Sequence, residues 1–311
     1  AIYERGFDLV IVDEAHRLKN KETMNWEFVN NIPKKYLLLV TATPLQNDLK
    51  ELYNLINLLR PELYQDYNDF KNNHVNGKRQ VQNLSILQEQ LSEIMIRNSR
   101  NDFDLTNENK RKLKLVPVKL SSKEQQLYDL ITNLVQEKYY GHKNNYSFQL
   151  LTLQREVCSS SFAVAKSVQR MLEKPQYQNL ESELQKILEK TEKVTKNEKL
   201  KVVNQIMTEV NNKAIIFTEY KATQQYLGYH LYQQGYNPVF FSGDLSDNQK
   251  EWAKAMFETE GDVLISTEAG GQGINLQFCN TIINYDLPWN PMKLEQRIGR
   301  VDRLGQEKDV M

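Results

Sequence analysis

Six short apolar runs, each ending in polar residues or glycine, constrain the fold of this chain more than any other feature. They are residues 7–12, 36–40, 214–217, 238–241, 263–266 and 281–285. Strands that are buried on both faces have this continuous apolar character, and helical patterns separate the later runs. Alternating strands and helices predict an α/β fold with doubly wound parallel sheets, in which ligands bind at the carboxyl ends of the strands.

The segments between these runs are mostly helical in pattern. Helices are expected over residues 44–59, 124–190, 220–234 and 293–303, with a polar, mostly helical stretch at 62–112, a strand at 113–120 and a linker at 191–201. We therefore expect residues 1–112 to form the C-terminal part of one α/β lobe, with a helical insertion from about residue 62. Residues 113–311 are expected to form a second, complete lobe with a helical insertion at about 124–190.

The overall charge gives no argument for nucleic-acid binding, because 40 Lys and Arg residues balance 40 Asp and Glu residues. Binding would need local basic patches, such as residues 110–112 or the lysines at 193–201, which could equally be solvated surface. The two cysteines have no metal-ligand spacing and fit a reduced, cytoplasmic setting. No apolar run approaches the roughly 18 residues of a membrane span.

Two adjacent carboxylates, Asp13 and Glu14, follow the first run in the sequence Asp-Glu-Ala-His. Carboxylates at a strand end can divide the labour of phosphoryl transfer, one holding Mg²⁺ and the other deprotonating the attacking water. In that interpretation Asp13 is the metal ligand and Glu14 is the base. The alternative is a solvated acidic turn, because Asp-Glu after a strand is common.

A threonine-rich turn, Thr41-Ala42-Thr43-Pro44, follows the second run. Its hydroxyl groups could hydrogen-bond to the acidic motif across neighbouring strand ends. Thr43 could instead act only as a helix N-cap with Pro44 in the first turn, and the two roles are compatible.

Two further segments carry residues suited to phosphate. Residues 266–276 are glycine-rich, which lets backbone amides approach an anion, although a flexible turn is the alternative. In residues 296–306, helical spacing places Gln296, Arg300 and Arg303 near one face, with Arg297 just behind. Such guanidinium groups clamp a triphosphate and neutralise the transferring phosphoryl, whereas the alternative is a solvated basic helix.

Taken in order, these four motifs resemble motifs II (the DEAH box), III, V and VI of the Swi/Snf branch of superfamily-two helicase-like ATPases. Residues 214–220 resemble motif IV, and residues 241–243 resemble the strand-end motif that follows it. The resemblance spans nearly the whole chain. It implies two RecA-like parallel-sheet lobes, the first one truncated, with inserted helical segments.

The resemblance also implies ATP and Mg²⁺ as cofactors and gives the motif residues their roles. Asp13 would bind the metal, Glu14 would activate water, and Arg297 and Arg300 would be the catalytic arginines, with Arg300 the better finger. The implied cofactor-binding residues are Gln296, Gly273, Asn275 and Arg303; the coupling residues are His16, Thr41, Thr43 and Gln46; the residues at a nucleic-acid backbone are Ser266, Thr267, Gly270 and Gly271.

Three departures from the family pattern matter. Ala42 replaces a frequent glycine, which should be tolerated. Asp302 replaces the usual histidine of eukaryotic remodellers. Residues 301–303 therefore look more like the bacterial branch, including its RNA-polymerase-associated type. This resemblance argues against a chromatin role. No Gly-x-x-x-x-Gly-Lys-[Ser/Thr] sequence is present. The family places this phosphate-binding loop before Asp13, so we expect a piece of a longer protein that hydrolyses little or no ATP by itself.

The sequence therefore predicts that the intact protein is an ATP-driven translocase on double-stranded DNA. We expect it to be monomeric, to have no membrane partner, and to act on RNA polymerase or another nucleoprotein. The resemblance implies translocation without strand separation, which is general in this branch. The alternatives are a non-catalytic nucleic-acid-binding or protein-interaction module and a motor subunit of a nuclease or restriction system.

Overall fold

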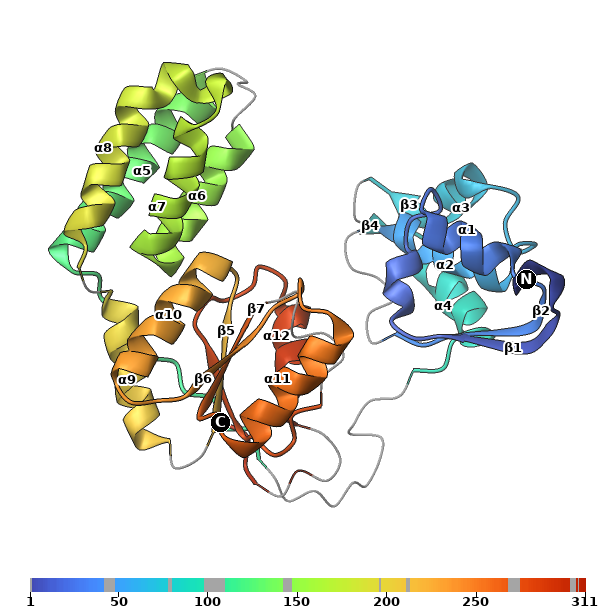
Figure 1. Cartoon of the computed structure of the whole chain (residues 1–311). Coiled ribbons are helices and arrows are strands. Elements are labelled where there is room, and N and C mark those ends of the chain that lie inside the picture. The colour runs from blue at the N-terminus through green and yellow to red at the C-terminus, as the bar shows by residue number, and fades with distance from the viewer. Residues whose placement is uncertain are drawn as a thin grey trace. The chain divides into compact units, whose positions relative to one another are not determined.

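The computed structural model describes residues 2–41, 48–77, 80–97, 110–141, 147–195, 197–210, 213–267, 275–302, 306 and 308–311. The chain divides into two compact units, Ala1–Leu105 and Thr106–Met311, and each is described by itself. Figure 1 labels most of the helices and strands of both units.

The first unit contains two of the expected strands. β1 (Phe7–Val12) and β2 (Lys34–Leu39) pair in parallel, and the short helices η1 (Ile2–Glu4) and η2 (Ala15–Leu18) flank β1. The chain returns between the strands through α1 (Met24–Asn31), where the Thr23 hydroxyl caps the first turn. One face of this sheet packs on a core formed by the following residues: Leu18, Trp26, Val29, Leu55 and Leu58.

The helix after β2 begins five residues later than the sequence suggested. α2 spans Leu49–Leu59, and the Asp48 carboxylate caps it by accepting a hydrogen bond from the Lys50 amide. The Asp48 backbone is extended, so the helix cannot continue back to Pro44. Residues 42–47, which include Pro44, lie outside the described part of the chain.

The segment after α2 is only partly helical. α3 (Tyr67–His74) and α4 (Leu84–Ser92) flank a small hairpin of β3 (Val75–Asn76) and β4 (Gln80–Val81), which the helical interpretation missed. Gly77, at φ +74°, follows β3 in the hairpin, where glycine adopts the left-handed conformation without strain. The rings of Tyr53, Tyr64 and Phe70 pack together beneath these elements.

The opposite face of the β1–β2 sheet is apolar and exposed. Its side chains are Leu9, Ile11, Tyr36, Leu38 and Val40, which are between 44 and 70% exposed. Parallel sheets normally bury both faces, so this surface has the character of a core face that lacks a covering layer.

We predict that Ile11→Thr combined with Leu38→Thr reduces self-association of this chain and its binding of a hydrophobic dye. Threonine has the β-branched shape that suits a strand and removes exposed apolar area. Light scattering and dye fluorescence would measure the change. The matched control is Leu37→Thr, which faces the core on the same strand and should cost about 1–3 kcal/mol of stability without reducing dye binding. Equal dye binding by the double variant and the unchanged chain would contradict the prediction.

The second unit is built on a four-stranded parallel sheet. β5 (Ala214–Thr218), β6 (Pro238–Phe241), β7 (Val263–Thr267) and β8 (Thr281–Asn284) lie in the order β6-β7-β5-β8. Helices α9 (Glu198–Glu209) and α10 (Lys221–Gln233) pack on one face and α11 (Asp247–Thr259) on the other. Every residue of β5 and β7 is buried. The predicted doubly wound arrangement is confirmed.

The helix expected at residues 220–234 is confirmed as α10, and capping contacts mark its end and the start of α11. Gly235, at φ +88°, follows the last turn of α10, and its amide bonds to the Tyr232 carbonyl. At the start of α11, Ser246 and Gln249 form a reciprocal capping box.

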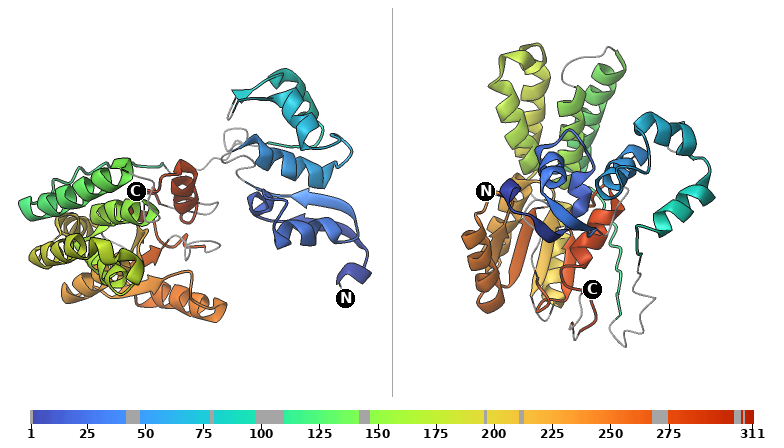
Figure 2. Two further views of the ribbon diagram at one scale, coloured as in Figure 1. Left: turned by 90° about the horizontal axis from the view of Figure 1, so that it is seen from above. Right: turned by 90° about the vertical axis from the view of Figure 1, so that its right-hand side faces the viewer.

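A helical bundle precedes the sheet and contains the expected helical insertion. It consists of α5 (Ser122–Gly141), α6 (Ser147–Ser159), α7 (Ser161–Leu172), the 3-10 helix η4 (Pro175–Leu180) and α8 (Glu181–Lys193). Its own apolar core includes Leu127, Leu153, Val168 and Leu184. In the right-hand view of Figure 2, these green to yellow-green helices project beyond the sheet.

Three sequence expectations for the second unit are wrong. Residues 113–120 form no strand. The nearest bridge among the described residues joins Arg111 to Val310, and Leu113 and Leu115 are 94 and 83% exposed. The expected linker at 191–201 is shorter, because α8 runs to Lys193 and α9 starts at Glu198. The last helix, α12 (Pro291–Ile298), ends at Gly299, so Arg300 lies in the turn after it. Among the described helices, none is long and apolar enough to cross a bilayer.

Candidate functional site

The acidic turn of the first unit leaves β1 directly. The Ala15 amide bonds to the Val40 carbonyl at the end of β2, which holds the two strand ends together. Glu14 has left-handed backbone angles, φ 51° and ψ 44°, although it is not glycine. A carboxylate residue held in this sparsely populated region is a feature found often at functional sites.

The side chains of the acidic turn contact the end of β2, as the sequence suggested. His16 lies with its Nδ1 atom 3.1 Å from Glu14 Oε2 and 3.5 Å from the Thr41 hydroxyl. The His16 side chain is 16% exposed and that of Glu14 is 43% exposed. The imidazole therefore joins the carboxylate of one strand end to the hydroxyl of the next.

Asp13 has the chemistry that a magnesium ion needs. Its side chain is exposed, and Oδ1 accepts a hydrogen bond from the Glu14 amide at 2.8 Å. Within the described residues, no three His, Cys, Asp or Glu side chains gather to hold a metal ion. One carboxylate fits Mg²⁺ nonetheless, because this ion commonly takes one or two carboxylates and completes its shell with water and substrate phosphates.

The second unit places Arg297 in a buried position. Its side chain is 5% exposed, and one guanidinium nitrogen donates to the Asn284 Oδ1 atom at 2.9 Å and to the Asp286 carbonyl at 2.7 Å. The guanidinium also lies 5.1 Å from the centre of the Phe217 ring. These contacts tie α12 to the ends of β5 and β8, a structural role that the motif interpretation did not foresee.

The glycine-rich and arginine-rich motifs are adjacent in space. The Leu276 amide bonds to the Arg300 carbonyl at 3.1 Å. The buried Gln306 amide nitrogen donates to the carbonyls of Gln277, Cys279 and Val301 at 2.9, 3.1 and 3.0 Å. Gln306 thus joins the end of one motif to the end of the other.

The basic residues 110–112 bind acidic side chains of the same unit. Arg111 donates to Asp302 at 2.5 Å and to Glu295 at 2.9 Å, and Lys112 lies 2.7 Å from an Asp309 carboxylate oxygen. The sequence offered phosphate contact or plain solvation for these residues, and the structure shows ion pairs instead. Asp302, noted only as a departure from the family pattern, therefore has a partner on the segment that leads into the second unit.

The remaining predicted residues vary in accessibility. Ser266 and Thr267 are 1 and 8% exposed, and the Ser266 hydroxyl donates to the Thr267 carbonyl. Gln296 is half-buried, and the exposed Asn275 donates to the Gln277 side chain. Six predicted site residues lie outside the described part of the chain: Thr43, Gln46, Gly270, Gly271, Gly273 and Arg303.

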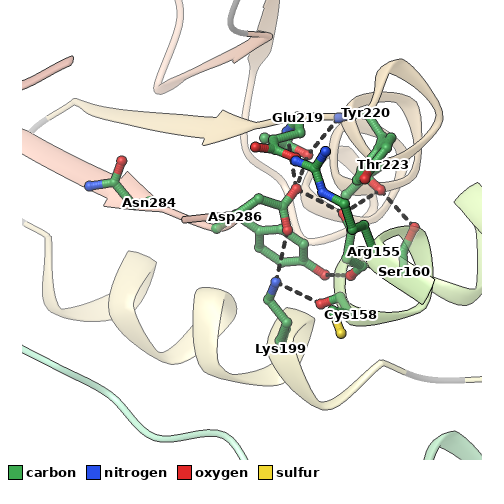
Figure 3. A network of polar contacts seen from close by, with 12 residues as sticks. Arg155, Cys158, Ser160, Lys199, Glu219, Tyr220, Thr223, Asn284 and Asp286 are labelled. Carbon is green, nitrogen blue, oxygen red and sulfur yellow. Dashed lines mark hydrogen bonds and ion pairs between the residues drawn. The ribbon is translucent and has the colours of Figure 1, made fainter. Parts of the chain in front are cut away.

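Asp286 is the main residue that the sequence did not indicate. It directly follows Tyr285 and receives hydrogen bonds from several segments (Figure 3). The available signal was weak, because a single acidic residue after an apolar run is common.

Comparison with known proteins agrees with these motifs. The model for the SNF2-related domain matches residues 1–175, and that for the helicase conserved C-terminal domain matches residues 196–305. This chain belongs to the SNF2-related family. The SNF2-related match covers more than half of the chain and ends at residue 175, inside the helical bundle.

Curated relatives of this SNF2-related chain are longer than the chain itself. It is 46% identical over 307 residues to "Uncharacterized ATP-dependent helicase YqhH" of Bacillus subtilis, covering 98% of this chain and 54% of that protein. It is 29% identical to "CHD3-type chromatin-remodeling factor CHR7" of Arabidopsis thaliana, over 97% of this chain and 24% of that protein. It is 27% identical to human "Chromodomain-helicase-DNA-binding protein 1", over 96% of this chain and 17% of that protein. The chain thus spans about half the length of the first of these relatives and less of the others.

A solved structure supports the fold of the SNF2-related chain. The C-terminal part of the Fun30 ATPase domain matches with a TM-score of 0.50 at 18% identity, covering 65% of this chain and 84% of that one. At this identity the match speaks for the α/β fold with parallel sheets alone.

We predict that Gln306→Ala lowers the melting temperature of this chain. The change leaves three carbonyls without their common donor, and a buried polar group that loses its partner costs about 1–3 kcal/mol. Thermal unfolding followed by circular dichroism would measure the loss. Lys308→Ala is the control, since it removes a long exposed side chain from the same segment. Equal melting temperatures of the two variants would contradict the assigned role.

Proposed function

We propose that the intact protein is an ATP-dependent motor that hydrolyses ATP on double-stranded DNA. The observation that carries the proposal is the acidic turn, where Glu14 is held in left-handed geometry beside His16 and next to the exposed Asp13. Two relatives support it through their names, one as an ATP-dependent helicase and one as a helicase-DNA-binding protein.

In this proposal, Glu14 orients the attacking water and accepts its proton. The contact with His16 fixes the carboxylate orientation, and the Thr41 hydroxyl near the same imidazole links that orientation to the end of β2. Asp13 would hold Mg²⁺, which would neutralise phosphate charge when bound. Arg300 supplies positive charge to the transferring phosphoryl, while Arg297 holds the turn that bears Arg300.

The proposed motor would bind ATP and double-stranded DNA, with Gln296 and Arg303 near the nucleotide. Asn275 would also lie near the nucleotide, and the segment that begins at Ser266 and Thr267 would contact the nucleic-acid backbone. RNA polymerase or another nucleoprotein is the proposed target. This chain by itself contains no Gly-x-x-x-x-Gly-Lys-[Ser/Thr] sequence, so a non-catalytic nucleic-acid-binding module is the second candidate for the 311 residues alone.

We predict that Glu14→Gln in the full-length protein lowers DNA-stimulated ATP turnover at least about 100-fold while ATP binding persists. The amide keeps the size of the side chain and cannot accept the proton. A coupled phosphate-release assay with duplex DNA would measure turnover. Glu22→Gln, at an exposed carboxylate of the same unit, is the control and should leave turnover unchanged. Unchanged turnover in Glu14→Gln would refute the proposal, and stimulation by single-stranded RNA but not duplex DNA would refute the assigned substrate.

A further inference from the structure

The Asp286 carboxylate is buried and saturated with donors. The side chain of Asp286 is 9% exposed. Its Oδ2 atom accepts hydrogen bonds from the Ser159 hydroxyl at 2.8 Å, the Thr218 hydroxyl at 2.6 Å and the Glu219 amide at 3.1 Å, while Oδ1 accepts from Lys199 Nζ at 3.0 Å. A buried charge with this many donors is held in one place, because moving it would break several charge-assisted bonds at once.

These donors come from separate elements. Ser159 ends α6 of the bundle and Thr218 ends β5. Lys199 lies in the first turn of α9 and is labelled beside Asp286 in Figure 3. Further polar contacts surround the carboxylate: the hydroxyls of Ser159 and Ser160 each lie 2.8 Å from that of Thr223, and Arg155 pairs with Glu219. The bundle is therefore attached to the sheet through a polar junction centred on Asp286.

The backbone of Asp286 faces the arginine motif. Its carbonyl accepts the 2.7 Å hydrogen bond from Arg297, near the end of α12. The Arg300 amide in turn bonds to the Arg297 carbonyl at 3.1 Å, and the Arg300 carbonyl holds the Leu276 amide. Asp286 thus contacts the bundle through its side chain and the arginine motif through its main chain.

We propose that Asp286 is a positioning residue that transmits the placement of the helical bundle to Arg297 and through it to Arg300. The inference rests on the proposed function, because it assigns Arg300 a part in phosphoryl transfer. A displacement of α6, which belongs to the bundle, would therefore shift Asp286 and with it the turn that bears Arg300. Asp286 itself touches no reacting atom in this scheme.

The test is Asp286→Asn in the full-length protein. Asparagine keeps the shape but removes the charge that faces Lys199 and places an amide group among donors. We expect kcat for DNA-stimulated ATP hydrolysis to fall at least about tenfold and KM for ATP to change less than about threefold. The reason is that a displaced Arg300 would weaken binding of the transition state more than binding of ATP. Ser159→Ala, which removes one donor from the same oxygen, should give a smaller fall in the same direction.

A second readout is independent of ATP. The backbone amides of residues 299–302 donate to carbonyls of residues 295–298 at the end of α12. Their hydrogen exchange should become faster in Asp286→Asn. The matched control is Asp247→Asn, at a carboxylate that is 98% exposed and pairs with Lys250 three residues away. It should leave kcat and exchange unchanged.

The outcomes separate the two proposals. If Glu14→Gln retains turnover, the proposed ATPase function fails whatever Asp286 does. If Glu14→Gln abolishes turnover but Asp286→Asn matches Asp247→Asn in kcat or in exchange at 299–302, the positioning role is overturned. A fall in kcat that only follows the loss of folded protein, measured by thermal unfolding, would also overturn it.

Discussion

Parallel sheets normally bury both of their faces, and this tendency organises the chain. In the second unit it is met: α9 and α10 pack on one face of the sheet and α11 packs on the other, so that β5 and β7 are wholly buried. In the first unit one face of β1 and β2 packs on Trp26 and its neighbours, and the other face is apolar and exposed. The sheet of the second unit is thus covered on both faces, and the β1–β2 sheet is covered on one face by the described residues of its unit.

The polar residues of both candidate sites lie at the carboxyl ends of the strands. A strand that leaves the core exposes backbone and side-chain groups that need partners, and the motifs supply them. At the end of β1 the partners are Glu14, His16 and Thr41; beyond β8 they are Asp286 and Arg297. Both sites combine a carboxylate at a strand end with a cation or imidazole from a neighbouring segment.

The strands and the acidic turn could be predicted from the sequence because each depends on a local pattern of residues. Apolar runs mark β1, β2 and β5 to β8, and Asp13 and Glu14 follow a run directly. Residues 113–120 also alternate in a way that suits a strand, yet a strand needs a hydrogen-bonded neighbour, and the described residues supply only the bridge at Arg111. The local sequence pattern does not show whether another strand lies within hydrogen-bonding distance.

The less predictable features depend on long-range contacts. Helical spacing placed Gln296, Arg300 and Arg303 near one helix face with Arg297 just behind, but α12 ends before Arg300. The burial of Arg297 could not be read from that spacing. Arg111 and Asp302 are 191 positions apart, and Ser159 and Asp286 are 127 positions apart. Such pairings follow from the packed fold, so the roles of Asp302 and Asp286 emerged only from the structure.

The pairing of residues 110–112 with 308–311 has a mechanical consequence. The Val310 amide bonds to the Lys110 carbonyl, the Lys112 amide bonds to the Val310 carbonyl, and Met311 bonds on its other side to Asn280 and Ile282. Because the entering and leaving segments run in parallel, tension between them would shear these bonds together rather than peel them apart one by one. Separating residues 110–112 from residues 308–311 would therefore require these hydrogen bonds to break at the same time.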